Sequence, residues 1–158
     1  MGAQSRLHKV SQQIIETSFP NLTKYHYSIT SPATTEYNCI AWAARDIAAW
    51  WWPDQYQMYF WPPNVPREET IAAFIQAYES QKYNLCNSPA YEEGWDRIAL
   101  YVDANGKPTH AARQLDNGSW TSKLGKLEDI EHSTLDSLVG LQYGAVAVIM
   151  RRKTSSVK

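Results

Sequence analysis

The feature of this sequence that most constrains its fold is a change in the spacing of apolar residues near residue 97. Before that point apolar side chains recur at helical spacing, as in Ile40, Ala43 and Ile47. After it, runs such as Arg97–Val102 have an extended pattern and are followed by turn residues. Helices followed by strands in this order are typical of an α+β domain, so we expect N-terminal helices packed on an antiparallel sheet.

Three helices are predicted in the first half of the chain, over Lys9–Ser18, Cys39–Trp50 and Glu68–Ser80. Asn38 directly precedes the second helix and is a good N-cap, because its side-chain oxygen can accept a hydrogen bond from a free backbone N–H group. Prolines at 53, 62, 63 and 66 interrupt regular structure after that helix. We therefore expect an irregular, aromatic-rich loop between the second and third helices.

Four strands are predicted in the second half, over Arg97–Val102, Thr109–Leu115, Ser119–Leu124 and Tyr143–Arg151. The last of them is strongly apolar, and we expect it at the centre of the sheet. The triplet Asp116-Asn117-Gly118 is a strong hairpin signal. Two further segments, Leu127–His132 and Thr134–Val139, are expected to form short helical turns.

Composition limits the class of protein. The chain has 158 residues, 44% apolar and 20% charged, which suits one domain over residues 1–158 with a flexible tail over 153–158. A net charge of -1 makes nucleic acid and acidic membranes poor partners. No apolar run is long enough to cross a bilayer, and residues 1–20 lack the apolar core of a signal peptide. We expect a cytoplasmic protein, with export by a leaderless route left open.

The sequence lacks the usual signals for cofactors. Its two cysteines, Cys39 and Cys86, are too few for a disulfide scaffold or a four-ligand zinc site. It contains no glycine-rich phosphate loop, no HExxH segment and no CxxC pair. We therefore expect neither a metal nor another cofactor.

Cys39 is the first candidate for a catalytic residue. It lies in the first turn of a predicted helix, where free N–H groups and the helix dipole lower the pKa of a thiol. The same N–H groups can bind the oxyanion that forms when a thiolate attacks a carbonyl. The competing interpretation is a small buried apolar side chain, which is the commoner role of a free cysteine.

A nucleophilic thiol needs a base, and the sequence offers His8, His26, His110 and His132. His110 is the best candidate, because small residues follow it in the predicted strand and leave room for a thiol or a substrate beside the ring. A lone histidine on a strand is also commonly a structural residue. His132 lies in an acidic segment, where we expect a solvated or capping role.

A resemblance to papain-like thiol hydrolases, particularly the compact NlpC/P60 type, is carried by YNCIAWA at a helix start and by a hairpin strand that opens with His110. A closer resemblance, to a family of uncharacterised bacterial domains, is carried by YNCIAWAA, WWWP, THAARQL and WTSKLG. It covers about residues 37–150. The superfamily resemblance implies a papain-like core, a Cys39 nucleophile, a His110 base and a third polar residue that orients the imidazole. Asn38 stands where NlpC/P60 enzymes commonly have Asp, so peptidoglycan specificity is not implied.

The third residue depends on the register of the hairpin. A two-residue turn places Ala112 opposite Lys123, whereas a three-residue loop places it opposite Ser122. Both registers are open on the sequence alone. Ser122 is the candidate, because a hydroxyl can accept a hydrogen bond from an imidazole, and a plain dyad of Cys39 and His110 is the alternative.

Aromatic side chains crowd the loop after the second predicted helix. They could wall a groove beside Cys39 or cap the core under the loop. We expect Trp51 and Trp52 to be core caps, because a helix that continues to Trp50 carries them about 18 Å from Cys39. Residues expected to contact a substrate are Asn38, Trp42, Gln114 and Trp61.

These features predict a cysteine hydrolase or acyltransferase that acts on an amide or thioester bond. The reaction would pass through an acyl-enzyme on Cys39, with His110 as general base. The substrate would be a small amide, a peptide or a protein, and a protein partner stays open. The alternative function is a catalytically inactive module of the same fold that binds a protein or a glycan.

Overall fold

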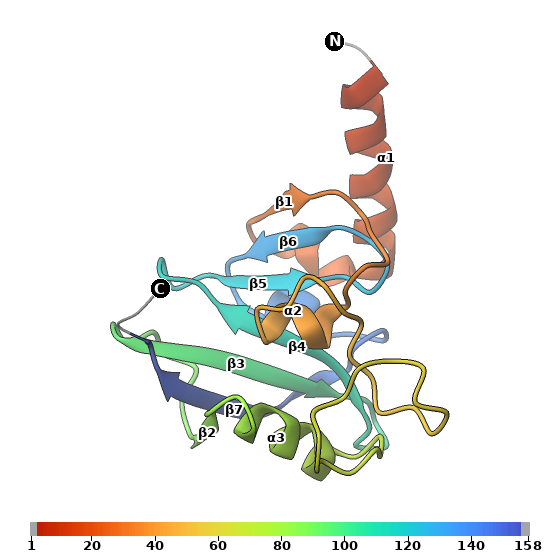
Figure 1. Ribbon diagram of the computed structural model, residues 1–158. Coiled ribbons are helices and arrows are strands. Elements are labelled where there is room, and N and C mark those ends of the chain that lie inside the picture. The colour runs from red at the N-terminus through yellow and green to blue at the C-terminus, as the bar shows by residue number, and fades with distance from the viewer. Residues whose placement is uncertain (1–2, 156–158) are drawn as a thin grey trace.

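The computed structural model describes residues 3–155, with side chains from residue 9 onward. Its seven strands form one antiparallel sheet, in the order β1-β6-β5-β4-β3-β7-β2 (Figure 1). The strands are β1 (Tyr27–Ser31), β2 (Asn84–Cys86), β3 (Trp95–Val102), β4 (Pro108–Gln114), β5 (Trp120–Lys123), β6 (Asp129–His132) and β7 (Ala145–Lys153). The helical segments are α1 (Ala3–Ser18), η1 (Pro20–Lys24), α2 (Cys39–Ala43), α3 (Ile71–Glu79) and η2 (Leu135–Leu138).

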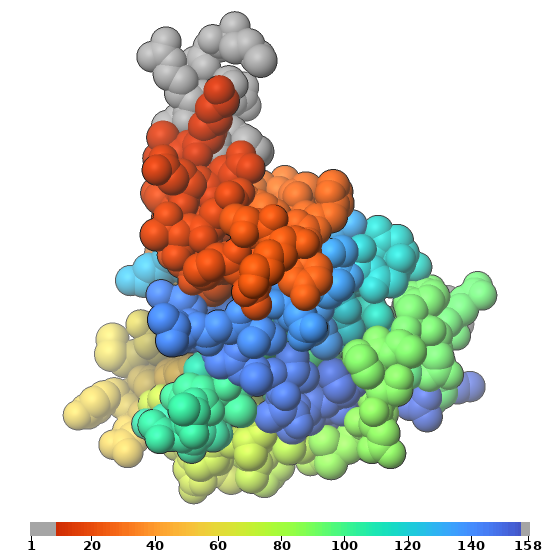
Figure 2. Space-filling view, turned by 180° about the vertical axis from the view of Figure 1, so that it is seen from behind, coloured from red at the N-terminus to blue at the C-terminus, as the bar shows by residue number. Residues whose placement is uncertain are grey.

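Both faces of the sheet are covered, and a separate buried cluster lies on each. α2 and α3 pack on one face, where Ile40 and Phe74 share a cluster with Leu100 of β3. α1, η1 and η2 pack on the other face, where Leu22 shares a cluster with Tyr101 of the same strand. Figure 2 shows this second face, with the red and orange N-terminal segments lying directly against the blue C-terminal ones. Successive side chains of β3 and β4 therefore point into different clusters.

The predicted α+β class and antiparallel sheet are confirmed, and each of the four predicted strands overlaps an observed one. The hairpin has the register of the three-residue loop, because Arg113 lies opposite Thr121 and Gln114 opposite Trp120. This register places Ser122 on the same face of the sheet as His110. Lys123 lies on the opposite face, with its ammonium group 5.4 Å from the centre of the Tyr37 ring.

Two predictions about the second half of the chain are wrong. The segment Leu127–His132 is not a helical turn, since its last four residues form β6 between β5 and β1. The acidic run suggests a solvated turn, but backbone pairing on both sides stabilises a strand there. β7 is not central, because it lies between β3 and the short edge strand β2. No helix among the residues that the structure describes is long and apolar enough to cross a membrane.

The second predicted helix is much shorter than expected, because it ends at Ala43 instead of Trp50. Arg45 adopts a left-handed backbone conformation with φ 66°. The N–H of Arg45 donates to the carbonyl of Trp42, and that of Asp46 donates to the carbonyl of Ala41. This pair of hydrogen bonds is a Schellman motif, which normally carries glycine at the left-handed position. The sequence has arginine instead of glycine at position 45, so no residue type marks the end of the helix. The apolar spacing therefore predicts a helix that continues beyond its actual end at Ala43.

The chain then turns back toward the start of α2. The Asn38 side chain donates to the Trp51 carbonyl at 2.7 Å and accepts from the Trp51 N–H at 3.1 Å.

At the other end of the chain Lys153 is the last residue of β7, and Thr154 donates to the Asp96 carboxylate. Residues 156–158, the end of the predicted flexible tail, lie outside the described residues.

Candidate active site

Cys39 is the first residue of α2, and its side chain is at the wall of a hollow of about 300 Å³. Asn38 caps the helix as predicted, because its Oδ1 accepts from the Ala41 N–H at 3.1 Å. Only 6% of Cys39 is exposed. The lining residues of this space, here called the Cys39 hollow, are Asn38, Cys39, Trp50, Trp52, Tyr59, Thr109, Gly125 and Tyr143.

The walls of the Cys39 hollow are largely aromatic, and the early end of α2 explains why. The reversal of the chain after Ala43 brings Trp50 and Trp52 back beside Cys39. The prediction that the tryptophans lie a full helix length away is therefore wrong. Trp51 is 3% exposed and belongs to the core, as expected, while Trp52 is half-buried and lines the hollow.

The thiol of Cys39 is protonated at neutral pH. Burial raises its pKa to about 11, and this effect outweighs hydrogen bonding from the backbone at Ala111 and Ile40, which acts in the opposite direction. A helix of five residues contributes little of the dipole that would favour a thiolate. The expectation of a lowered pKa at the helix start is wrong for this state of the protein.

His110 lies in a chain of hydrogen bonds on the other side of β4. It is fully buried, and its Nε2 lies 2.9 Å from the Ser122 hydroxyl oxygen. The same oxygen lies 2.8 Å from Nε2 of His132, and Nδ1 of His132 lies 2.8 Å from the Thr134 carbonyl. Ser122 therefore contacts the candidate base, and His132 lies behind it.

Both histidines are neutral at pH 7. Burial lowers the pKa of His110 well below its usual range, and a charge on His132 would lower it further. Burial also lowers the pKa of His132 to about 4. A neutral imidazole carries one N–H donor and one bare acceptor nitrogen, so each ring must adopt one of two tautomers.

The hydrogen bonds assign these tautomers in sequence. The Thr134 carbonyl can only accept, so His132 carries its proton on Nδ1 and its Nε2 is an acceptor. The Ser122 hydroxyl must then donate to His132 and accept from Nε2–H of His110. This leaves Nδ1 of His110 as a bare lone pair. That atom is buried and has no hydrogen-bond partner among the residues that the structure describes.

Cys39 and His110 both lie next to Tyr143, but they do not hydrogen-bond each other. Tyr143 lines the Cys39 hollow, and its ring stacks on His110 with 4.0 Å between ring centres and an interplanar angle of 9°. Ala111, the residue after His110, shares a buried cluster with Cys39. Cys39 therefore lies on the face of β4 that carries Ala111 and the His110 ring on the opposite face, and no hydrogen bond joins them among the described residues.

Of the residues predicted to contact a substrate, Asn38 lines the Cys39 hollow and the other three do not. Trp42 donates from Nε1 to the Thr121 hydroxyl, and Trp61 donates from Nε1 to the Pro66 carbonyl. Gln114 lines a different hollow on the far face of the sheet, beside Trp120. Substrate contact by these three residues stays a prediction.

Several residues of the site were missed by sequence reasoning. They are Thr109, Gly125 and Tyr143. Trp50, Trp52 and Tyr59 line the Cys39 hollow, in agreement with the groove-wall interpretation of the aromatic loop. His132 is fully buried, so the expectation of a solvated role for it is wrong. For His132 a signal exists, because polar and apolar residues alternate in Asp129–His132 as they do in a half-buried strand. For Tyr143 no local signal exists, since it reaches the site only through tertiary packing.

Within residues 3–155 no group of three or more His, Cys, Asp or Glu could hold a metal ion.

Comparison with known proteins identifies the family but no activity. No curated protein and no solved structure matches the chain. Residues 28–151, which include Cys39, His110, Ser122 and His132, match a domain of unknown function, DUF7689. The chain thus belongs to the DUF7689 family.

Proposed function

We propose that this protein is a thiol-dependent hydrolase or acyltransferase for an amide or thioester bond, with Cys39 as nucleophile and His110 as general base. The observation that carries the proposal is the bare Nδ1 of His110. Within the described part of the chain this buried lone pair has no partner, and its ring stacks on the tyrosine that lines the Cys39 hollow. Buried polar atoms are rarely left unpaired without a reason, and a general base needs such a lone pair.

The protonation states favour general-base activation over a preformed ion pair. The thiol and the imidazole are both neutral at pH 7, because burial disfavours the charged form of each. As the sulfur attacks the carbonyl carbon, its proton moves to Nδ1 of His110 and the carbonyl electron pair moves to the oxygen. Backbone N–H groups at the start of α2 can stabilise the oxyanion.

The second half of the reaction returns the proton. The imidazolium of His110 donates it to the leaving nitrogen or sulfur as the bond to the acyl carbon breaks, and the acyl group remains on Cys39 as a thioester. Water or an acceptor amine then attacks the thioester, with His110 again taking a proton. The thiol and Nδ1 must approach each other for the first step. Catalytic hydrogen bonds commonly tighten only in the substrate complex.

The resemblance to papain-like and NlpC/P60 thiol hydrolases supports the same proposal. In that interpretation α2 with Cys39, β4 with His110 and β5 with Ser122 are the papain-like core. The resemblance rests on few residues and their order. The chemistry of the Cys39 hollow therefore carries more weight than the family likeness.

A binding module of the same fold is the second candidate function. The observation that favours it is the resting state of Cys39, which is 6% exposed and has a raised pKa. The aromatic walls formed by Trp50, Trp52 and Tyr59 suit a planar or apolar ligand without any chemistry.

Alkylation of Cys39 by iodoacetamide at pH 7 distinguishes the two functions. A thiol with a pKa of about 11 holds roughly 300 times less thiolate than an unperturbed thiol, so without a base Cys39 should react very slowly. If His110 takes the proton, Cys39 should react at least as fast as Cys86, and His110→Gln should slow it more than tenfold. Mass spectrometry of both cysteines in the same sample gives the two rates.

His26→Gln is the matched control, because His26 is exposed and far from the site in sequence. It should leave both rates unchanged. Circular dichroism melts show whether each variant is folded. Slow alkylation of Cys39 that is equal in the wild type and in folded His110→Gln would reject the thiol mechanism and favour the binding module.

A further inference from the structure

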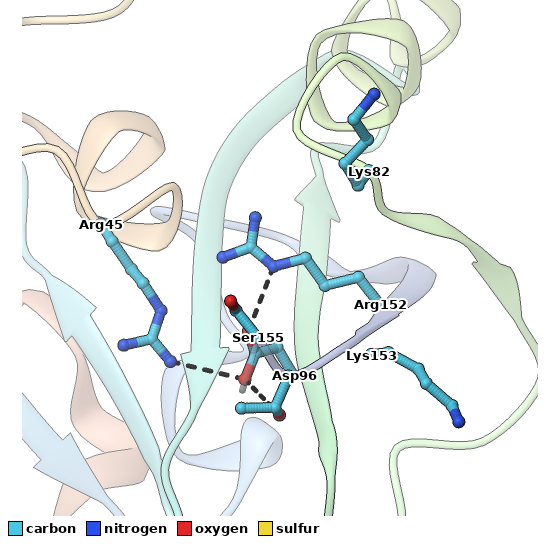
Figure 3. A pocket seen from close by; sticks show the side chains of 7 residues that line it. Arg45, Lys82, Asp96, Arg152, Lys153 and Ser155 are labelled. Atoms are coloured by element: carbon cyan, nitrogen blue, oxygen red, sulfur yellow. Dashed lines mark hydrogen bonds and ion pairs between the residues drawn. The ribbon is translucent and has the colours of Figure 1, made fainter. Parts of the chain in front are cut away.

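A second hollow, of about 440 Å³, lies where the C-terminal ends of α2 and α3 meet β3 and β7. We call it the arginine hollow. The ionisable side chains that line it are Arg45, Lys82, Asp96, Arg152 and Lys153 (Figure 3). Four of these five are basic, although the whole chain has a net charge of -1. Positive charge is therefore concentrated at this place.

Among the described residues Asp96 is the one carboxylate that lines the arginine hollow, and its oxygens already accept hydrogen bonds. It accepts from Arg152 at 3.1 Å, from Arg45 at 3.5 Å and from the Thr154 hydroxyl at 3.0 Å. In Figure 3 Arg45 and Arg152 point toward Asp96, whereas Lys82 and Lys153 point away from it. One negative charge therefore faces two guanidinium groups.

A third guanidinium group, that of Arg113, does not line the arginine hollow. Arg113 of β4 lies on the same face of the sheet, and burial lowers its pKa to about 10, with the nearby charge of Arg45 as the next cause. Arg113 is 8% exposed. Its Nε donates to the Trp42 carbonyl at 3.5 Å, and its guanidinium lies 5.3 Å from the centre of the Trp42 ring. Among the described residues it forms no ion pair with a carboxylate.

The hydroxyl of Tyr83 is a further unpaired group beside these charges. It is buried and has no hydrogen-bond partner among the described residues. The guanidinium of Arg152 lies 4.5 Å from the centre of the Tyr83 ring, which places Tyr83 beside these charges. An unpaired hydroxyl and a buried cation without a counterion are both costly unless something else binds there.

Helix ends explain part of this charge but not all of it. Arg45 and Lys82 follow α2 and α3, where the free carbonyls of a helix favour positive charge. Both residues have left-handed backbones, with φ 66° and 75°. Arg113 lies on a strand, so no helix end accounts for it.

We propose that the arginine hollow binds the phosphate group of a small phosphorylated molecule. Two guanidinium groups and two ammonium groups line the hollow against one carboxylate among the described residues, and this excess of positive charge suits a phosphate monoester, which carries close to two negative charges at pH 7. Planar guanidinium forks bind phosphate oxygens in pairs. A volume of about 440 Å³ leaves room for a small organic group beside the phosphate. This site does not depend on the thiol chemistry proposed for Cys39.

Calorimetric titration with inorganic phosphate, at constant ionic strength and pH 7.5, tests the proposal. The wild type should bind one phosphate saturably. Arg45→Gln should weaken binding at least tenfold, because Arg45 is exposed and its loss leaves the core intact. Arg152→Lys keeps the charge but removes the planar fork that lines the hollow, and should weaken binding as well. Glycerol 3-phosphate should bind more tightly than inorganic phosphate if the rest of the hollow takes an organic group.

Lys107→Gln is the matched control, since Lys107 is exposed and follows the opposite end of β3 from Asp96. It removes the same charge and should bind phosphate like the wild type. Three outcomes would overturn the proposal. They are the absence of saturable binding by the wild type, equal weakening by Lys107→Gln and Arg45→Gln, and binding of acetate as tight as that of phosphate.

Discussion

Lowering the pH from 7 to 5 should destabilise the folded protein, because His110 and His132 are buried and neutral. The pKa of His132 is about 4 in the folded protein, against a usual value of 6.5. The unfolded chain therefore binds the proton first as the pH falls. Stability from this residue is fully present above about pH 6.5 and is lost progressively as the pH falls toward 4.

The size of the effect follows from this difference. At pH 5 the unfolded chain is almost fully protonated at this position while the folded protein is not, and His132 alone lowers the free energy of unfolding by about 2 kcal/mol relative to pH 7. His110 acts in the same direction, since burial lowers its pKa too. Urea titrations followed by tryptophan fluorescence at the two pH values measure the change.

His132→Asn removes the titrating ring and can keep the hydrogen bond to the Thr134 carbonyl. Its free energy of unfolding should fall by about 2 kcal/mol less between pH 7 and 5 than that of the wild type. His26→Gln, at an exposed position, should retain the wild-type pH dependence. A wild-type protein that is as stable at pH 5 as at pH 7 would refute the buried, neutral histidine chain.

Four substitutions test other parts of the structure. Ser122→Ala leaves Nε2 of both histidines without its partner and should lower the free energy of unfolding by about 1–3 kcal/mol, so unchanged urea stability would contradict the hydrogen-bond chain. Trp51→Ala should cost about 3–5 kcal/mol because Trp51 is 3% exposed in the core, whereas Trp52→Ala, at the half-buried wall of the Cys39 hollow, should cost less. Thermal melts of the two tryptophan variants compare them, and the reverse order would be inconsistent with this burial. Cys39→Ala should change stability by only about 1 kcal/mol, and a much larger loss in the same melts would mark the thiol as an essential part of the core.

Local features of the fold could be predicted from the sequence, because they depend on residues a few positions apart. Asn38 caps α2 through its own side chain and the next N–H groups. The triplet Asp116-Asn117-Gly118 closes the hairpin as predicted, whereas the register that places Ser122 beside His110 is one of two that the sequence leaves open. Alternation of side chains along β4 then puts Ala111 and Ala112 in different buried clusters.

Contacts between distant segments could not be predicted in this way. β1 and β2 are short edge strands whose hydrogen bonds come from β6 and β7. The acidic segment Asp129–His132 becomes a strand because it pairs on both sides, which gains more backbone hydrogen bonds than an isolated turn could. Its position brings His132 to Ser122 and completes the chain behind His110.

The sequence by itself determined the α+β class and offered Cys39, His110 and Ser122 as candidates, but it left open the hairpin register on which the choice of Ser122 depends. Tertiary structure decided the surroundings that control their chemistry. The reversal at Arg45 brings Trp50 and Trp52 to Cys39, and the packing of Tyr143 covers His110. Burial by these distant segments sets the pKa of the thiol and of both imidazoles, because desolvation depends on everything that surrounds a group in space and not on its neighbours in the chain.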